Sequence, residues 1–233
     1  MEFEQIIQEL GKKIYHPVYF LTGEEPYYID QVSDFIEKNV LSEAEKGFNQ
    51  TVFYGRDTDP MTVMEAARRF PMMANQQVVI VKEAQEWKNL EALRKYLAAP
   101  SKTTILVINY KYKKIDGRTE LAKALKKNAL YFESKKIRDY QIPQWVDKYI
   151  RDHGYTITPQ ATQMLADFLG DDLSKVVNEV RKLFILVPKG TQITADHIEK
   201  NIGISKEYNP FELTTALGNR DILKANRIIT YFA

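Results

Sequence analysis

The chain contains no cysteine in its 233 residues, which excludes disulfide bonds, thiol catalysis and cysteine-ligated metal sites. This composition fits a reducing compartment, and we expect a cytoplasmic protein. An excess of one charge is also lacking, because 33 Lys and Arg residues stand against 31 Asp and Glu residues, giving a formal net charge of +2. The overall charge therefore does not indicate nucleic-acid binding, and any basic surface must be local.

Long apolar runs and clusters of metal ligands are missing as well. No apolar run approaches the roughly 20 residues of a membrane-spanning helix, so we expect no membrane partner, and the charged helix predicted over residues 2–14 is not a signal peptide. His16, His153 and His197 are scattered without carboxylates at ligand spacing. We therefore expect no metal site and no cofactor. Spacing suggests no catalytic residues either.

The first part of the chain alternates helical and strand patterns. The runs at residues 78–81 (VVIV) and 105–108 (ILVI) are unbroken apolar segments, typical of strands that helices cover on both faces. The predicted strands are residues 18–21, 51–54, 78–81, 105–108 and 130–132, and the predicted helices are residues 2–14, 26–41, 61–69, 87–98 and 118–127. Strands alternating with helices predict a parallel α/β sheet with helices on both faces.

The pattern changes after residue 138, where we predict helices only. They cover residues 142–152, 160–169, 172–187 and 195–202. We expect their bundle core to include Trp145, Ile150, Leu165, Phe168, Val176, Val180 and Leu183. Residues 203–210 are predicted to be a linker, and helices at 211–217 and 221–232 follow. Since the last helical pattern is still running at residue 233, we expect the chain to be incomplete there.

The turn after the first strand resembles a phosphate-binding loop only in its position. Thr22-Gly23-Glu24-Glu25 joins a strand to a helix that begins at Pro26. A phosphate-binding loop needs several glycines and then Lys-Ser/Thr, and this turn has one glycine and neither of the other two. We expect Glu24 and Glu25 to lie at the mouth of the turn and repel phosphate. From this segment alone, an ordinary strand-to-helix turn remains the favoured interpretation.

Four segments resemble the bacterial DNA polymerase III delta subunit family, which is in the clamp-loader branch of the AAA+ proteins. They are residues 18–29 (VYFLTGEEPYYI), 69–81 (RFPMMANQQVVIV), 173–183 (LSKVVNEVRKL) and 208–213 (YNPFEL). Each segment is weakly specific by itself, but the four occur in the order of the family, and the resemblance extends over essentially the whole chain.

The resemblance implies an AAA+-like (P-loop NTPase-like) α/β domain over residues 1–138 and a small helical lid domain over residues 139–205. Residues 206–233 would be a linker and the incomplete beginning of a carboxy-terminal collar domain. Ser205-Lys206 falls where ATP-responsive relatives carry a Ser-Arg sensor. We interpret this pair as part of the linker, because Lys does not replace Arg in bidentate phosphate contacts.

The resemblance further implies a non-catalytic subunit of the bacterial DNA polymerase III holoenzyme, in the cytoplasm. Such a subunit neither binds nor hydrolyses ATP. It binds and opens the ring-shaped sliding clamp (the beta subunit), so that the clamp can be loaded on primed DNA during replication. Its collar domain joins the ATP-binding loader subunits and a delta-prime-like subunit. The classification as a DNA-directed DNA polymerase would follow from membership of this complex only.

The main candidate for a clamp contact is Met72-Met73. Pro71 disfavours continuation of the preceding helix, so two apolar side chains fall in a short connection, where polar residues are usual. Methionine is flexible and suits insertion into an apolar pocket. The resemblance implies that residues at these two positions insert into the clamp, although the second is usually aromatic. Packing in the core is the alternative, and for Phe70, also a candidate contact, the pattern favours a core anchor.

A second candidate is the basic cluster, by which we mean Lys111, Lys113, Lys114 and Arg118, with Tyr110 and Tyr112 between them. Cations interleaved with aromatic rings can bind phosphates and stack on bases. A solvated loop, or a contact with a neighbouring subunit, is the alternative. Two other functions therefore stay open: a degenerate AAA+ nucleotide hydrolase, and a DNA-binding module that acts through this cluster.

Overall fold

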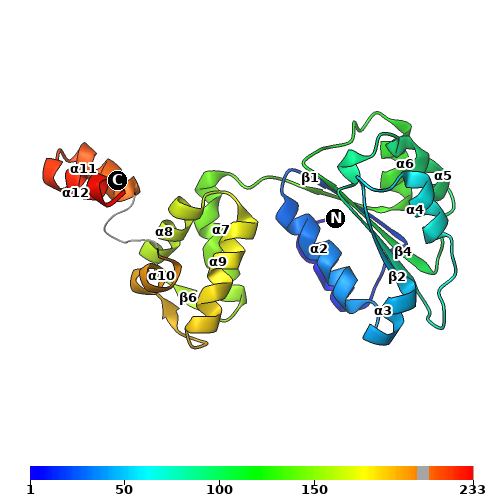
Figure 1. Ribbon diagram of the computed structural model, residues 1–233, viewed down its shortest axis with the longest axis horizontal. Helices are drawn as coiled ribbons and strands as arrows, with labels where there is room; N and C mark the ends of the chain where they lie inside the picture. The colour runs from blue at the N-terminus through cyan, green and yellow to red at the C-terminus, as the bar shows by residue number, and fades with distance from the viewer. Residues whose placement is uncertain (204–209, 233) are drawn as a thin grey trace. The chain divides into compact units, whose positions relative to one another are not determined.

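The computed structural model describes residues 1–203 and 210–232. It divides into two compact units, Met1–Lys136 and Ile137–Ala233, and each is described here by itself (Figure 1). Most of the predicted linker and the pair Ser205-Lys206 lie outside the described residues. The division of the chain into three functional domains stays a prediction.

The first unit is built on one five-stranded parallel sheet. Its strands, in the spatial order β2-β3-β4-β1-β5, are β2 (Gln50–Tyr54), β3 (Gln77–Lys82), β4 (Thr104–Lys111), β1 (Val18–Gly23) and β5 (Leu130–Ser134). Every neighbouring pair is parallel, and Phe20 of β1 lies opposite Ile108 of β4 and Tyr131 of β5. All five predicted strands and the predicted parallel α/β class are confirmed.

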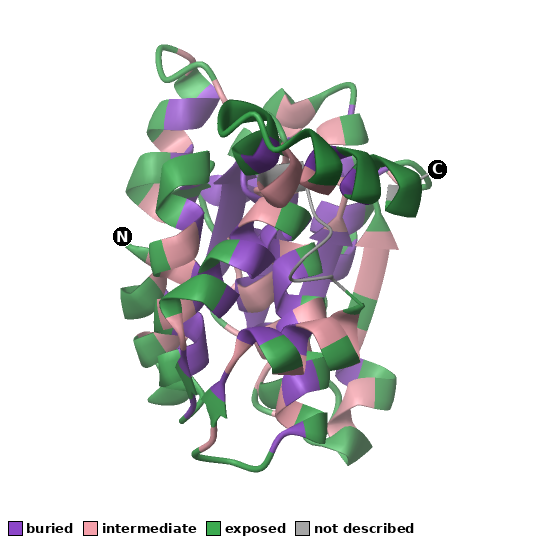
Figure 2. Cartoon of the chain, turned by 90° about the vertical axis from the view of Figure 1, so that its left-hand side faces the viewer, coloured by how far each residue is buried: buried purple, intermediate pink, exposed green. Residues whose placement is uncertain are grey.

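Helices cover both faces of this sheet, which explains its unbroken apolar strands. Val18 and Phe20 pack into a core with α4 (Pro60–Ala67), α5 (Arg94–Leu97) and α6 (Glu120–Asn128). Tyr19 and Leu21, which point the other way, pack into a second core with α1 (Phe3–Gly11) and α2 (Pro26–Asn39). Successive residues of a strand alternate between its faces, so each position here meets a core. The buried interior appears in purple in Figure 2.

The predicted helix over residues 87–98 is wrong for most of its length. The structure has two 3₁₀ turns, Ala84–Glu86 and Leu90–Leu93, before the short helix α5. Trp87, Leu93 and Tyr96 are all buried in the core that α4 and α6 share, and Leu90 packs against it. These positions recur every three residues, which is the period of a 3₁₀ helix and not of an α-helix.

The second unit begins with four helices at the predicted places. They are α7 (Ile142–Asp152), α8 (Pro159–Leu169), α9 (Leu173–Leu186) and α10 (Ala195–Ile202). The prediction of helices only is wrong in one detail, because β6 (Thr156–Ile157) pairs in parallel with β7 (Gln192–Ile193). Two residues are too short a run to produce a strand period in the sequence.

Most of the core predicted for this unit is buried, with Trp145 and Phe168 as the exceptions. Phe168 is exposed, and its ring lies 6.0 Å from the Lys175 ammonium of α9. Its prediction as a core residue is therefore wrong: it lies in the last turn of α8, where its ring meets a cation and not the bundle core. Trp145 is half-buried and stacks on Tyr149 with ring centroids 5.3 Å apart.

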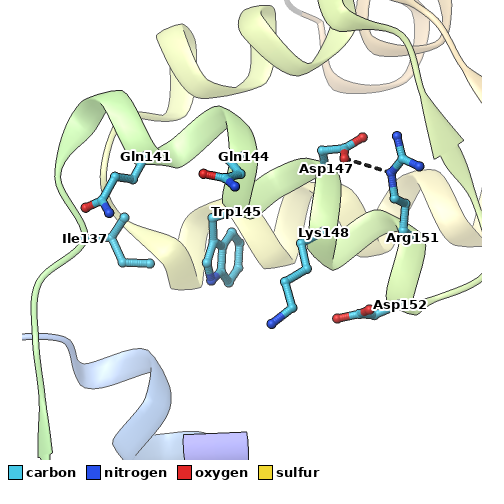
Figure 3. Close-up of a pocket in the computed structure, with 8 residues that line it drawn as sticks. All are labelled: Ile137, Gln141, Gln144, Trp145, Asp147, Lys148, Arg151 and Asp152. Atoms are coloured by element: carbon cyan, nitrogen blue, oxygen red, sulfur yellow. Dashed lines mark hydrogen bonds and ion pairs between the residues drawn. The ribbon is translucent and has the colours of Figure 1, made fainter.

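Trp145 also lines an open pocket of about 480 Å³ on α7 (Figure 3). Arg151 pairs with Asp147 at 2.7 Å on the same helix, and none of the predicted site residues lines this pocket.

The last two helices, α11 (Pro210–Gly218) and α12 (Ile222–Phe232), pack against each other through Ala216, Ala225 and Ile228. Among the helices of residues 1–203 and 210–232, none has both the length and the apolarity to cross a membrane.

Candidate protein-binding site

Three apolar side chains are exposed within four residues of one connection. We call residues 68–76, between α4 and β3, the methionine loop. Phe70 is 84% exposed, Met72 is 61% exposed and Met73 is fully exposed. Isolated apolar residues on a surface are ordinary, but a contiguous group indicates a contact site. The structure therefore does not place Met72 and Met73 in the core.

The expectation that Phe70 anchors the core is wrong. The core-facing positions of α4 include Val63 and Ala67, and the helical period would bring the next such position to residue 70 or 71. However, α4 ends at Ala67, so Phe70 no longer follows that period. Pro71, which has no N–H and disfavours a helix before it, accounts for the early end of α4.

A buried glutamine holds the base of the methionine loop. The Nε2 atom of Gln77 lies 3.3, 3.4 and 2.5 Å from the carbonyl oxygens of Ala66, Ala67 and Arg69. It is also 2.9 Å from the hydroxyl of Thr104, which donates to the Ala67 carbonyl at 2.8 Å. Carbonyls at a helix C-terminus have no partner within the helix. Gln77 and Thr104 satisfy them here and so fix where the loop begins.

A second buried amide holds the tip of the methionine loop. Asn49 ends α3 (Glu43–Asn49) and is only 3% exposed. Its Oδ1 accepts from the Met72 N–H at 2.6 Å, and its Nδ2 donates to the Met72 carbonyl at 2.9 Å and to the Glu45 carbonyl at 3.2 Å. Met73, the next residue, has φ of 53°. That left-handed conformation costs a non-glycine residue about 1–2 kcal/mol, which the bonds to Asn49 help to offset.

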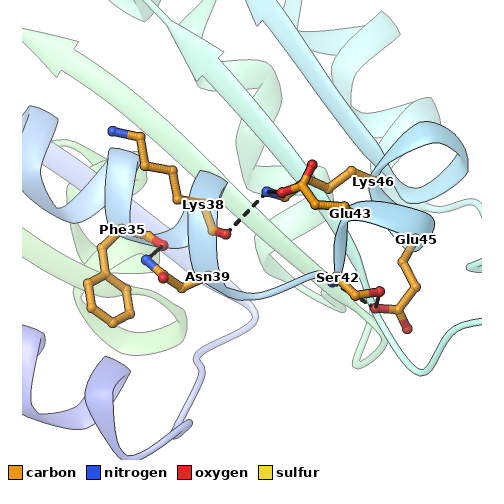
Figure 4. A network of polar contacts seen from close by, with 7 residues as sticks. All are labelled: Phe35, Lys38, Asn39, Ser42, Glu43, Glu45 and Lys46. Carbon is orange, nitrogen blue, oxygen red and sulfur yellow. Dashed lines mark hydrogen bonds and ion pairs between the residues drawn. The ribbon is translucent and has the colours of Figure 1, made fainter.

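The helix that carries Asn49 is itself tied down at its start (Figure 4). The Glu45 carboxylate accepts from the Ser42 N–H at 2.9 Å and from the Ser42 hydroxyl at 2.7 Å. These bonds favour the charged form and lower the pKa of Glu45. The Lys46 ammonium donates to the Lys38 carbonyl at the end of α2, at 3.2 Å. The α2 helix, α3 and the loop tip thus form one hydrogen-bonded series.

Sequence reasoning missed two residues beside this site. Phe48 is 75% exposed on α3, next to the residue that holds Met72. Phe48 is the one large apolar side chain in this seven-residue helix, and that signal could have drawn attention to it. The pairing of Asn49 with Met72 joins residues 23 positions apart, and nothing in the sequence pattern indicates it.

The strand-to-helix turn that would hold phosphate in an active nucleotide site is filled by protein atoms. We call Gly23–Glu25 the Gly23 turn. The N–H of Gly23 donates to the Lys113 carbonyl at 3.3 Å. The N–H groups of Glu24 and Glu25 donate to the carbonyl and the hydroxyl of Ser134, at 3.2 and 3.3 Å. The backbone donors that a phosphate would need therefore already have partners within the chain.

The two carboxylates of the Gly23 turn lie in different surroundings. Glu25 is buried, and its carboxylate accepts from the Tyr27 N–H at 3.1 Å, which caps α2. Glu24 is exposed and lies 3.5 Å from the Lys114 ammonium. The expectation that both carboxylates occupy the mouth of the turn is therefore wrong for Glu25, because capping the helix turns it inward.

The basic cluster begins at the carboxyl end of β4, and each of its cations has an acceptor nearby. The partners are Asp30 for Lys111 at 2.6 Å, the Gln85 carbonyl for Lys113 at 3.0 Å, Glu24 and Glu133 for Lys114 at 3.5 and 3.2 Å, and Asp116 for Arg118 at 2.7 Å. The neighbouring carboxylates raise the pKa of Lys114, and Arg118 lowers the pKa of Asp116. Much of the local charge is thus balanced, and DNA binding by this cluster stays a prediction.

The methionine loop and the Gly23 turn lie at opposite ends of the strands of the sheet. The loop precedes β3, whereas the turn follows β1, and the two strands are parallel members of one sheet. A six-residue strand spans about 20 Å, so the two features are separated by roughly that length.

In the part of the chain that the structure describes, no group of three or more His, Asp or Glu side chains is placed to hold a metal ion.

Comparison with known proteins identifies close relatives. The profile of the family described as "DNA polymerase III, delta subunit" matches residues 19–135. The DNA polymerase III subunit delta of Bacillus subtilis is 31% identical over 240 residues, covering 94% of this chain and 69% of that protein. The solved structure of the Bacillus subtilis DNA clamp loader delta protein is 27% identical, with a TM-score of 0.76, and the match covers 98% of this chain and 70% of that one.

Proposed function

This chain belongs to the DNA polymerase III delta subunit family, and from that premise we propose that it binds the sliding clamp and favours its open form. The open clamp could then be loaded on primed DNA. The single observation that carries the proposal is the exposure of Phe70, Met72 and Met73 on a loop held at both its base and its tip. These side chains are the proposed contact with an apolar pocket on the clamp.

The energetics support a contact that starts at these residues and extends beyond them. Burying one such side chain contributes about 1.5–3 kcal/mol, so three contribute about 4.5–9 kcal/mol. Association costs about 4–15 kcal/mol in lost freedom. The three side chains alone therefore cannot hold the clamp firmly, and Phe48, exposed on neighbouring α3, is a candidate for the wider surface.

Two arginines give the contact a charge preference. Arg68 and Arg69 are exposed and immediately precede the three apolar side chains. Cations at the rim of an interface accelerate association with an acidic surface and make it sensitive to salt. We therefore expect the pocket on the clamp to have an acidic rim, and association to slow as the salt concentration rises.

The proposed role needs no nucleotide site in this chain. The N–H groups of the Gly23 turn already donate to Lys113 and Ser134, and Glu24 adds negative charge where phosphate would bind. We infer that the subunit neither binds nor hydrolyses ATP. Binding of a fluorescent ATP analogue at micromolar concentration, abolished by changing Glu24, would instead favour the alternative of a degenerate nucleotide hydrolase.

The remaining parts of the proposal follow from the family. Residues 139–205 would form a lid domain, and residues 206–233 the linker and the beginning of a collar. Through that collar the subunit would join the ATP-binding loader subunits and a delta-prime-like subunit in the bacterial cytoplasm. DNA would then be contacted as part of the complex. Salt-dependent DNA binding by the isolated chain, lost on replacing Lys113 and Lys114, would instead favour a DNA-binding module.

The test is calorimetric titration of the purified bacterial sliding clamp with the wild-type chain and with the Met72→Ala/Met73→Ala variant. We expect measurable wild-type binding, and a loss of at least tenfold in affinity for the double variant. Met61→Ala is the matched control, because Met61 is also an exposed methionine but lies in the first turn of α4. A folded wild-type chain that does not bind the clamp would overturn the proposal.

Opening is tested separately from binding. A clamp labelled with a pair of dyes on either side of one subunit interface would be mixed with a saturating amount of the chain. We expect the dyes to separate with the wild type and with Met61→Ala, but not with Met72→Ala/Met73→Ala. Binding without separation of the dyes would reduce the role to that of a docking subunit.

A further inference from the structure

We propose that Asn49 is a positioning residue that orders the methionine loop before the clamp arrives. This inference rests on the proposed function, since it concerns the same contact. It assigns a specific task to a buried side chain on α3, a helix that is distant in sequence from the loop.

Two hydrogen bonds, which we call the bridge, link the Asn49 side chain to the backbone of Met72. The amide of Asn49 accepts from the N–H of Met72 at 2.6 Å and donates to the carbonyl of the same residue at 2.9 Å. Both backbone polar groups of Met72 are thus bound to one side chain. Because Asn49 is 3% exposed, water competes poorly for these bonds.

This bridge sets the direction of the two methionine side chains. With the Met72 backbone fixed, and Met73 at φ of 53°, the chain turns sharply at the tip, and both side chains remain in solvent. A left-handed non-glycine residue is uncommon and persists where the surroundings enforce it. In the described chain, Asn49 supplies such enforcement directly beside Met73.

An ordered loop binds more tightly than a loop that must become ordered on binding. If only a fraction of the molecules holds the competent loop, the apparent dissociation constant rises by the inverse of that fraction. Removing the bridge would lower the fraction while leaving every clamp-contacting side chain in place. The affinity should therefore fall although no contact atom is lost.

Only an amide fits all three hydrogen bonds at this position. Asparagine provides an acceptor for Met72 N–H and a donor for the carbonyls of Met72 and Glu45. Aspartate would keep the acceptor but would turn a carboxylate oxygen, instead of a donor, toward the carbonyls of Met72 and Glu45, which would repel it. Alanine would lose all three bonds without this repulsion, so we expect both variants to bind the clamp more weakly than the wild type, and Asp no better than Ala.

The test combines Asn49→Ala with Met72→Ala/Met73→Ala in a double-mutant cycle, read by calorimetry with the purified clamp. We expect Asn49→Ala alone to weaken binding about tenfold, which corresponds to about 1.4 kcal/mol. In the Met72→Ala/Met73→Ala background it should cause no further loss, because its effect passes through those two side chains. A merely structural role would leave the two effects additive.

Asn39→Ala is the matched control. Asn39 also donates its side-chain amide to a helix carbonyl, that of Phe35 at 2.8 Å, but it lies on α2 and is not bonded to the loop (Figure 4). We expect this variant to bind the clamp like the wild type. Hydrogen exchange of the Met72 amide gives a second readout, which should be at least tenfold faster in Asn49→Ala and unchanged in Asn39→Ala.

The outcomes separate this inference from the proposed function. If the wild type binds and Met72→Ala/Met73→Ala does not, while Asn49→Ala binds normally, the inference fails and the proposed function stands. Additive losses in the cycle also overturn it. If Asn49→Ala does not fold, Asn49→Ser takes its place in the cycle, because the serine hydroxyl can still pair with one of these backbone groups. We expect it to weaken binding by about threefold, and normal binding by that variant overturns the inference.

Discussion

Replacing Gly23 by alanine should destabilise the first unit severely. A Cβ atom at this position would stand 2.1 Å from the Ser134 carbonyl oxygen and 2.5 Å from its hydroxyl. Gly23 also has φ of +124°, a conformation that L side chains rarely adopt. Overpacking costs about 1–3 kcal/mol and backbone strain about 1–3 kcal/mol, so we expect a loss of about 3 kcal/mol or more.

Urea unfolding followed by the fluorescence of Trp87, the tryptophan in the core of the first unit, measures this effect. With a slope of about 2 kcal/mol per molar urea, the midpoint should fall by about 1.5 M. Gly47→Ala is the control, because Gly47 lies in α3 with open space around it. That change should be neutral or stabilise the protein by up to about 1 kcal/mol.

The result also distinguishes two roles for Gly23. In a working phosphate-binding loop the glycine lets the backbone approach the ligand, so its replacement would chiefly reduce nucleotide affinity. Here it lets β1 approach β5, and its replacement should chiefly reduce stability. A destabilisation below about 1 kcal/mol, with an unchanged urea slope, would refute the reasoning.

Two further predictions concern pH. The Asp59 carboxylate caps α4, and hydrogen bonds from Thr62 and Met61 lower its pKa. The stability that the charged carboxylate gives to the folded protein should be fully present above about pH 4 and should be lost as the pH falls through the lowered pKa. Asp59→Ala should lower the melting temperature at pH 7 by about 3 °C and abolish that part of the acid dependence in calorimetric scans. Burial raises the pKa of Tyr19 to about 12, so the unfolded chain releases its proton first, and stability should fall as the pH rises above about 10. Tyr19→Phe should flatten this alkaline decline and, by removing the acceptor for the His16 N–H, cost about 1 kcal/mol at neutral pH.

The sequence predicted the sheet well, because both of its faces are buried. Val78–Val81 and Ile105–Ile108 meet a core on either side, and no surface face interrupts the apolar run. Helix starts were equally legible where proline occupies the first turn, as at Pro26 and Pro60. The membership of the delta subunit family, predicted from four short segments, is confirmed.

The features that the sequence did not predict depend either on contacts between residues far apart in the chain or on where a helix ends. In the sequence, Phe70 continues the helical spacing of α4. The helix ends at Ala67, so that spacing no longer predicts whether Phe70 is buried. The bridge from Asn49 to Met72 depends on tertiary packing of α3 against the loop. The inward turn of Glu25 depends on an N–H two residues later. Two signals in the sequence were missed: the three-residue spacing from Trp87 to Tyr96, and the aromatic Phe48 in a short helix.

The exposure of Met72 and Met73 has a chemical consequence for a chain without cysteine. Methionine is then its main target for mild oxidants, and Met73 and Met72 are the most exposed of the six, whereas Met64 and Met164 are buried. Oxidation to the sulfoxide turns an apolar side chain into a polar one. Peroxide should therefore weaken the proposed clamp binding in proportion to the sulfoxide formed at these two positions, while the unfolding transition hardly moves. Treatment with methionine sulfoxide reductases should restore that binding.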